Sequence, residues 1–215
     1  MLNESFFEEL KEIIKPYFEI HGSHSFDHTW RVYNNALRIS EGEEVDLDIV
    51  KASALLHDVA RKMQDESEKI GCHAEEGAKL AEKILKEKGF PEEKIESVAY
   101  SIKVHRYSLG IVPDTNEAKL LQDADRLDAL GAITIGRVFD YAAKKNRPMH
   151  DPSLILNEYV HNSESASSIN HFYEKILKIK PENFYMKNAK ELAEERYNFV
   201  KAFVERFIDE WNGKK

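Results

Sequence analysis

Apolar residues recur at intervals of three and four positions along almost the whole of this chain. That spacing gathers them on one face of an α-helix, whereas the alternation that is typical of β-strands is not sustained in any segment. The pattern therefore predicts an all-α fold, a single-domain bundle of about nine or ten helices.

Capping residues predict several helix ends. Asp46 is expected to cap a helix that runs to about Ala60, because its carboxylate can accept hydrogen bonds from the amide groups of a first turn. Gly89 is expected to end a helix that begins near Cys72. Pro91 suits the first turn of the helix that follows.

Two long helical stretches complete the second half of the chain. Asp114 and Glu117 are expected to form a capping pair for the stretch EAKLLQDADRLDALGAITIGRVFDYAA, which should bend near Gly131. A terminal helix is expected over about Asn188 to Trp211, where apolar residues repeat at helical spacing. We therefore expect one domain over residues 1–215, with its core at roughly 20–145 and C-terminal helices at 153–212 packed on it.

Charge and composition exclude several classes of partner. Lys and Arg number 31 against 39 Asp and Glu, a net charge of −8, so no diffuse basic surface can hold a nucleic-acid duplex. No apolar run reaches the roughly 18 to 20 residues that span a bilayer. The start MLNESFFEELKEII is acidic and amphipathic, unlike a signal peptide, and the single cysteine cannot form an intramolecular disulfide. We expect a cytoplasmic protein with no membrane partner.

Polar side chains occupy the apolar faces of five predicted helical segments. These are His28, His57 with its neighbour Asp58, His73, His105 and Asp125. A buried imidazole or carboxylate without partners costs on the order of several kcal/mol, and convergence on one metal ion satisfies several such groups together. The pattern therefore favours a metal site between helices.

Each of these residues also has a simpler interpretation. A single histidine on an apolar face is more often a hydrogen-bonded core residue than a metal ligand. The His-Asp pair is weak on its own, because His150-Asp151 repeats it in front of Pro152, where a turn is expected. His57-Asp58 differs in closing an amphipathic helix, where both side chains can reach one ion.

The order and separation of these residues resemble those of the HD-domain metal-dependent phosphohydrolases. The matching motifs are His28 in HSFDHTWRV, His57-Asp58 in ALLHDVARK and Asp125 in LQDADRLDALGAI, and the resemblance covers about Ser5 to Trp211. It implies that these four side chains bind one divalent metal ion. The resemblance favours Mn²⁺, and mixed nitrogen and oxygen ligands also suit Fe²⁺, Co²⁺, Zn²⁺, Ni²⁺ or Mg²⁺.

The segments around Asp125 indicate which branch of this family the chain resembles. DADRLDALGAI, with CHAEEGAKLAEKIL before it and INHFYEKILKIK after it, is similar to the bacterial branch whose characterised members hydrolyse nucleoside triphosphates. That branch often has Asp directly after the His at the position of His24, where this chain has Ser25. Asp27 is expected to compensate by orienting a ligand imidazole.

Three roles are possible for His73 and His105. Some HD branches hold a second metal with histidines at comparable places, so a second ion is not excluded. The two imidazoles could instead bind phosphate or protonate a leaving group.

Further residues are candidates for substrate binding or catalysis. Arg31, Arg61 and Lys62 are expected to neutralise phosphate oxygens, the last two from a helix C-terminus. Other candidates are Asp65 and Glu76 for proton handling, Arg106 and Arg126 for phosphate contact, and Asp128 for support of Asp125.

The resemblance predicts hydrolysis of a small phosphorylated substrate, a nucleotide, and above all of (deoxy)nucleoside triphosphates with release of pyrophosphate. A phosphomonoesterase or cyclic-nucleotide phosphodiesterase of the same class is the first alternative. An HD-type di-iron oxygenase and a non-catalytic helical metal-binding module are remote ones. Base and sugar preference depends on a few pocket contacts that a sequence does not reveal. Aromatic segments such as HFYEKILKI could pack internally or across a homodimer interface.

Overall fold

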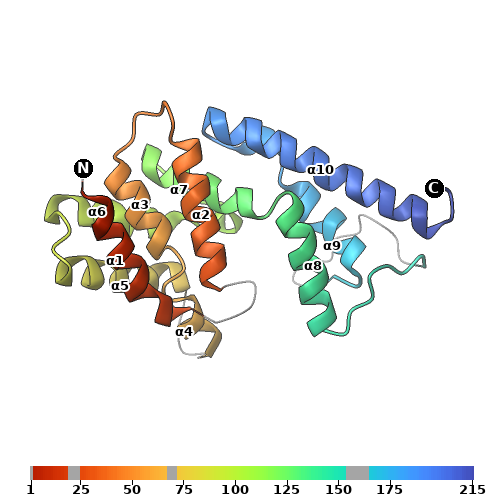
Figure 1. Cartoon of the computed structure of the whole chain (residues 1–215), viewed down its shortest axis with the longest axis horizontal. Helices are drawn as coiled ribbons and strands as arrows, with labels where there is room; N and C mark the ends of the chain where they lie inside the picture. The colour runs from red at the N-terminus through yellow and green to blue at the C-terminus, as the bar shows by residue number, and fades with distance from the viewer. Residues whose placement is uncertain (1, 19–24, 67–71, 154–164) are drawn as a thin grey trace. The chain divides into compact units, whose positions relative to one another are not determined.

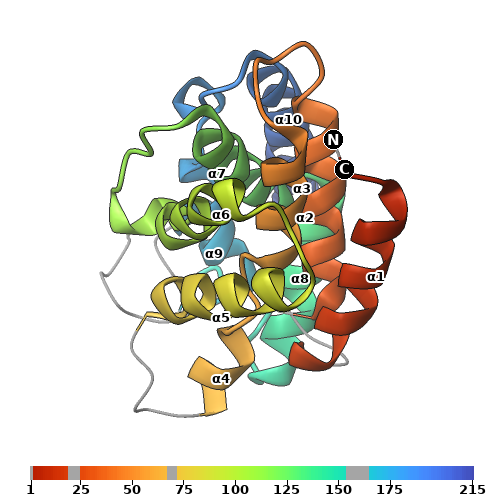
Figure 2. The ribbon, with the colours of Figure 1, turned by 90° about the vertical axis from the view of Figure 1, so that its left-hand side faces the viewer.

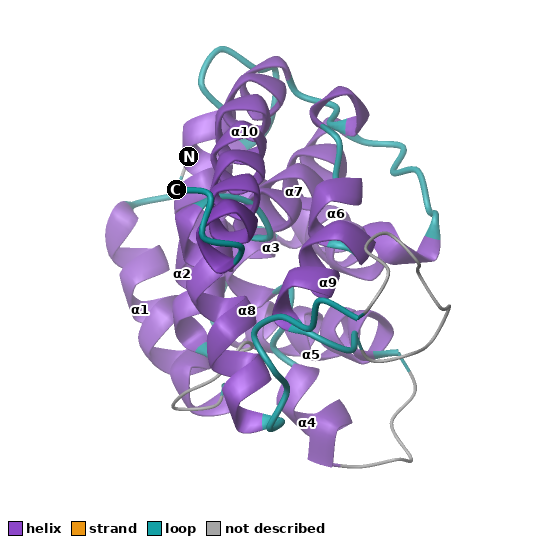
Figure 3. Cartoon of the chain, turned by 90° about the vertical axis from the view of Figure 1, so that its right-hand side faces the viewer, coloured by secondary structure: helices purple, strands orange, loops and turns teal. Residues whose placement is uncertain are grey.

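The computed structural model describes residues 2–18, 25–66, 72–153 and 165–215. Over these ranges the chain forms α-helices α1 to α10 and four short 3-10 helices, and no strand is present in them (Figures 1 and 3). The prediction of an all-α fold is confirmed.

The chain divides into two compact units. The first contains Met1–Arg126 and Tyr185–Asn188, and the second contains Leu127–Phe184 and Ala189–Lys215. The prediction of one domain over residues 1–215 stays a prediction.

Seven α-helices lie wholly or largely in the described residues of the first unit. They are α1 (Glu4–Ile14), α2 (Phe26–Ile39), α3 (Leu47–Leu56), α4 (Arg61–Glu66), α5 (His73–Glu87), α6 (Glu92–Val104) and the part of α7 (Asn116–Asp128) up to Arg126.

Helix α3 lies at the centre of this unit. It packs against α1, α2 and α6, and α5 runs beside α6 (Figure 2). Its sequence LDIVKASALL is almost continuously apolar, as expected for a helix that is covered on several sides. Every residue from Ala52 to Ala60 is buried, so the His-Asp pair at the end of α3 lies within the core.

The observed start of α3 agrees with the predicted one, whereas its observed end does not. The Asp46 carboxylate accepts hydrogen bonds from the amides of Asp48 and Ile49, which confirms the predicted cap. The helix ends at Leu56 rather than at about Ala60, because residues 57–60 form turns before α4 begins at Arg61. The apolar spacing of the sequence continues through these turns, so it gives no sign that the helix ends at Leu56.

The ends of α5 and α6 lie close to the predicted positions. Gly89 follows α5 with φ +72°, a left-handed conformation that glycine adopts without strain. Pro91 is the N-cap of α6, one position before the first turn that was predicted for it.

The predicted capping pair of α7 is wrong. The Thr115 hydroxyl accepts the Ala118 amide at 3.3 Å and therefore serves as the cap. Asp114 instead accepts the Tyr100 hydroxyl at 3.1 Å, and Glu117 accepts the Asp46 amide at 2.9 Å. Both carboxylates thus bond to groups distant in sequence, which local capping rules do not foresee.

The second unit contains α8 (Ala132–Lys144), α9 (Ser168–Glu174) and the part of α10 (Lys187–Trp211) from Ala189 onward. The predicted bend near Gly131 is a break between α7 and α8. Gly131 has φ +87°, and an added Cβ would lie 3.1 Å from Cγ of Arg196. The Arg196 guanidinium donates to the Leu127 carbonyl at 2.8 Å, so the end of α7 is bonded to α10.

Helix α10 confirms the predicted terminal helix. Ala193, Val200 and Val204 of its apolar stripe are buried. Phe139 of α8 and Phe172 of α9 add aromatic contacts, with ring centroids 6.1 Å apart. The core of the second unit is therefore partly aromatic.

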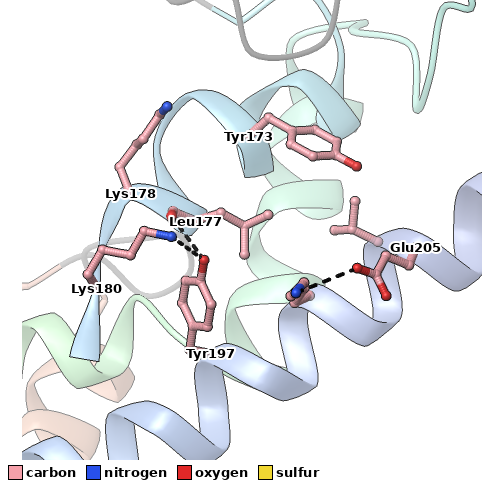
Figure 4. A pocket seen from close by; sticks show the side chains of 8 residues that line it. Tyr173, Leu177, Lys178, Lys180, Tyr197 and Glu205 are labelled. Atoms are coloured by element: carbon pink, nitrogen blue, oxygen red, sulfur yellow. Dashed lines mark hydrogen bonds and ion pairs between the residues drawn. The ribbon is translucent and has the colours of Figure 1, made fainter. Parts of the chain in front are cut away.

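A hollow of about 260 Å³ lies in the second unit (Figure 4). Leu177 and the buried Val204 contribute its apolar lining. Lys180 donates to the Tyr197 hydroxyl and lies over the same ring, 4.6 Å from its centroid. The hollow thus combines an apolar lining with a lysine that is held in place by a tyrosine.

Among the described residues, no helix combines the length and the apolar character that crossing a bilayer requires.

Candidate metal centre

Six side chains of the first unit approach one another from the ends or first turns of helices. His28 is in the first turn of α2, His57 is the C-cap of α3 with Asp58 after it, His73 opens α5, His105 is the C-cap of α6, and Asp125 is on α7. Helix ends leave backbone groups free to bond the functional side chains, which makes them suitable places for such a site.

Four of these residues form a first cluster. Nε2 of His28 lies 3.3 Å from Nε2 of His57 and 3.4 Å from Oδ1 of Asp125. Oδ2 of Asp58 lies 3.9 Å from Nε2 of each of the two histidines. These are the four residues that the sequence predicts as ligands of one metal ion.

The other carboxylate oxygen of Asp58 faces a second cluster. Oδ1 of Asp58 lies 3.3 Å from Nε2 of His73 and 3.7 Å from Nε2 of His105. In each cluster the candidate ligand atoms of three residues lie within 4.8 Å of one another, His28, His57 and Asp125 in one and Asp58, His73 and His105 in the other. Asp58 is therefore shared between two adjacent groups of potential ligands.

Hydrogen bonds fix which nitrogen of three imidazoles carries the proton. Nδ1 of His57 donates to the Ala54 carbonyl at 2.8 Å, and Nδ1 of His105 donates to the Ile102 carbonyl at 2.6 Å. Nδ1 of His73 donates to Oε1 of Gln64 at 2.7 Å. In the neutral ring the other nitrogen, Nε2, then carries a lone pair and faces the cluster, as a metal-ligating imidazole does.

Burial and charge set the ionisation of the site. Burial, together with the charge of His57, lowers the pKa of His105 to about 4, so this ring is neutral at pH 7. Burial alone would raise the pKa of Asp125. The hydrogen bond from His28 and the charges of the surrounding histidines outweigh that effect and lower the pKa to about 2.

The donor set fits a divalent cation. Ionised carboxylates and neutral imidazoles point lone pairs at a common place, and in an interior with little water such groups need a cation between them. Nitrogen and oxygen ligands together suit the first-row divalent metals. The side chain of Asp125 is 29% exposed against 7% for Asp58, so the first cluster meets solvent at Asp125.

The predicted basic residues lie at several places around these helices. Arg31 is half-buried on α2, one turn after His28. Arg61 and Lys62 are half-buried in the first turn of α4, so their expected position at a helix C-terminus is wrong. The cause is the turn at 57–60, which lets a new helix start at Arg61.

Two further arginines bond to protein groups. Arg106 is half-buried and donates to Sγ of Cys72 at 3.4 Å. Arg126 is 5% exposed and pairs with Asp123 at 2.5 Å. The roles predicted for both in phosphate contact stay predictions.

The acidic candidates differ in their surroundings. Glu76 is half-buried on α5 and accepts from Lys79 at 2.8 Å, and Asp27 is exposed in the first turn of α2. Asp128, in the second unit, accepts from Arg137 at 2.7 Å. Asp65 belongs to α4, but its side chain lies outside the described residues, as does His24.

Sequence reasoning missed the residues that orient the ligands. Gln64 holds His73, and the Asn35 amide donates to the carbonyl of Ala124, the residue before Asp125, at 3.2 Å. Neither residue belongs to a recognisable motif. The bonds from His57 and His105 to carbonyls three residues earlier do have a signal, because a histidine at a helix C-terminus can donate to an unpaired carbonyl.

An all-α scaffold that gathers imidazoles and carboxylates at its helix ends is typical of a helical metal-binding protein. The family model for the HD domain matches residues 25–130. The chain is also 31% identical to YpgQ of Bacillus subtilis (strain 168) over 181 residues, 84% of this chain and 81% of that protein. It belongs to the HD domain family and is a metal-dependent phosphohydrolase.

Solved structures agree with this assignment. An HD-superfamily hydrolase from Bacillus thuringiensis is 36% identical, with a TM-score of 0.77 over 97% of this chain and 98% of that one. A predicted HD-superfamily hydrolase from an uncultured Thermotogales bacterium is 32% identical, with a TM-score of 0.68 over 95% and 92%. Bacillus subtilis YpgQ in complex with ADP has 27% identity and a TM-score of 0.70 over 96% and 94%.

Proposed function

We propose that this phosphohydrolase acts on nucleotides, and specifically on nucleoside or deoxynucleoside triphosphates, with release of pyrophosphate. The observation that carries the proposal is the joining of two ligand clusters through Asp58, with Asp125 on the solvent side. One cluster can hold an ion while the neighbouring side chains face the phosphate chain of the substrate. The structure of YpgQ with ADP supports a nucleotide as the substrate class.

His28, His57, Asp58 and Asp125 would hold one divalent ion, and family resemblance favours Mn²⁺. When bound, such an ion lowers the pKa of a water molecule and neutralises phosphate oxygens. The protein's contribution is to keep Nε2 of His57 unprotonated, through the bond from Nδ1 to Ala54, and to keep Asp125 ionised. Both features prepare the cluster for a cation.

His73 and His105 would act on the phosphate chain. Both rings lie beside Asp58, and their Nδ1 protons are held by Gln64 and Ile102, which leaves Nε2 toward the cluster. A phosphate anion nearby raises the pKa of an imidazole, because opposite charge favours the protonated form. A proton at Nε2 could then bond a phosphate oxygen or pass to the leaving group.

A hydrolysis screen tests the proposal. Purified protein loaded in turn with Mn²⁺, Fe²⁺, Co²⁺, Zn²⁺, Ni²⁺ or Mg²⁺ is given nucleoside mono-, di- and triphosphates and cyclic nucleotides, and ³¹P NMR identifies the products. We expect pyrophosphate and a nucleoside monophosphate from triphosphates. Orthophosphate as the first product, or a linearised cyclic nucleotide, would indicate the phosphomonoesterase or phosphodiesterase alternative. Retention of the ion without hydrolysis of any nucleotide would refute the proposal.

A further inference from the structure

An exposed tyrosine follows the cluster residue His105 after one intervening residue. Tyr107 begins a short 3-10 helix, Tyr107–Leu109, and is 41% exposed. The guanidinium carbon of Arg126 lies 4.2 Å from the centroid of the Tyr107 ring. At this distance a cation lies against the ring in a cation–π contact, so the ring combines a supported side with an exposed one.

The supporting guanidinium is held rigidly. Arg126 pairs with the fully buried Asp123 at 2.5 Å, and Asp123 also accepts the amides of Tyr185 and Met186, each at 2.8 Å. The Arg126 guanidinium carbon also lies 5.4 Å from the centroid of the Tyr185 ring. The charge beneath Tyr107 is therefore fixed by a buried ion pair on α7.

The segment that follows Tyr107 is also anchored to α7. The amide of Gln122, a fully buried residue, donates to the carbonyls of Val104 and Ile111, both at 3.2 Å. The segment exposes three apolar side chains, Leu109, Ile111 and Val112. An apolar segment that is anchored in this way loses little entropy when a ligand covers it.

Tyr107 and Arg126 are both close in sequence to residues of the two ligand clusters. Tyr107 is two residues after His105, and Arg126 is the residue after Asp125. Successive Cα atoms are about 3.8 Å apart, so the Cα atoms of Tyr107 and His105 are at most about 7.6 Å apart.

We propose that Tyr107 is the platform on which the nucleobase of the substrate stacks, with Arg126 supporting the ring from the protein side. This inference rests on the proposed function and names the part of the molecule that recognises the base. Stacking on an aromatic face accepts every base, because each has a π-face. The enzyme should therefore act on several nucleobases.

Binding of two matched ligands tests the platform. ADP and inorganic pyrophosphate share a diphosphate, but pyrophosphate has no base, so calorimetric titration of metal-loaded protein with each ligand isolates the contribution of the base. Tyr107→Ala should weaken ADP binding about tenfold, the order of magnitude of a lost base–aromatic stack, and should leave pyrophosphate binding within about twofold. Tyr107→Phe should bind ADP like the wild type, because it keeps the ring. Tyr141→Ala, which removes an equally exposed tyrosine of α8, should change neither affinity.

The outcomes separate this inference from the proposed function. Unchanged ADP binding by Tyr107→Ala would overturn the platform. An equal loss of ADP and pyrophosphate binding would also overturn it, because the tyrosine would then act through the cluster. If the wild-type protein binds pyrophosphate but neither binds nor hydrolyses nucleotides, the proposed function itself fails. Circular dichroism of each variant confirms that it is folded.

Discussion

Nε2 of His28 and Nε2 of His57 face each other at 3.3 Å inside the first unit. Two neutral imidazoles with lone pairs at these atoms repel each other, and two protonated ones repel more strongly. The bond from Nδ1 of His57 to the Ala54 carbonyl keeps its proton on the far side of the ring. In the metal-free protein a proton on Nε2 of His28 therefore satisfies the pair, and a metal ion can take the place of that proton.

This competition predicts that metal affinity depends on pH. An imidazole nitrogen binds a metal ion only when it carries no proton, so protons compete with the ion and its affinity should weaken as the pH falls. Calorimetry of Mn²⁺ binding at pH 8, 7, 6 and 5, in buffers of different ionisation enthalpy, measures both effects. Equal affinity at pH 8 and pH 5 would show that no proton occupies the site.

Replacing His57 by alanine should abolish metal binding and hydrolysis together. Loss of a group that only orients a ligand lowers affinity about 10- to 100-fold, so loss of the ligand itself should cost at least about 100-fold. Elemental analysis and the hydrolysis assay measure the two effects. His150→Ala is the matched control, since it changes the other His-Asp pair, in the second unit, and should keep the ion. A His57→Ala protein with a lower melting temperature but normal turnover would support the non-catalytic module.

His73 distinguishes one ion from two. If the first cluster holds the single ion, wild-type protein contains about one equivalent of metal, and His73→Ala retains it while hydrolysis falls about 10²- to 10⁴-fold, the usual contribution of an acid or base group. Mass-spectrometric metal analysis after gel filtration measures the stoichiometry. Two equivalents that fall to one in His73→Ala would place a second ion between Asp58, His73 and His105.

The convergence of these side chains could be predicted because the helical periodicity of the sequence is strong. His28, His57 and His105 lie on apolar faces, and a helical bundle turns such faces toward one interior. The turn after His57 could not be predicted in the same way, because residues 57–60 are as buried as the helix before them and continue its apolar pattern. A helix and a buried turn then look alike in sequence.

The groups that hold His73 and Arg126 in place could not be predicted, for a different reason. Gln64 and Asp123 bond residues whose proximity depends on how helices pack, and one polar residue on a helix carries no sign of its partner. Gly131 illustrates a third limit. The apolar periodicity of the sequence continues across Gly131. In the structure α7 and α8 are nevertheless separate helices there, because Gly131 has a φ of +87° and Arg196 packs closely against it.

The stability of the metal-free protein should fall with pH in two stages. The pKa of His105 is about 4 when folded and about 6.5 when unfolded, so between these values the unfolded chain binds a proton that the folded protein rejects. The free energy of unfolding should therefore fall by about 3 kcal/mol as the pH drops from 6.5 to 4. Asp125, with a folded pKa of about 2, contributes stability above its unfolded pKa of about 3.9 that is lost from about pH 4 to pH 2.

Urea unfolding of chelator-treated protein at pH 7, 5.5 and 4.5 measures the first stage. His105→Gln, which removes the titrating ring, should flatten the curve in this window. If the variant keeps the full pH dependence of the wild type, then other groups are responsible for it.

Asp123→Ala should be among the more destabilising substitutions in the first unit. It removes the carboxylate that pairs with the buried Arg126 and that accepts the amides of Tyr185 and Met186. Removing one member of a buried ion pair typically costs about 3 to 5 kcal/mol, because the remaining charge stays in a medium of low polarity. Urea unfolding at pH 7 measures the change, and Glu87→Ala, which breaks an exposed pair with Lys83, should cost well under about 1 kcal/mol. A loss from Asp123→Ala as small as this control would mean that water reaches Arg126, and the rigid support assigned to Tyr107 would then fail with it.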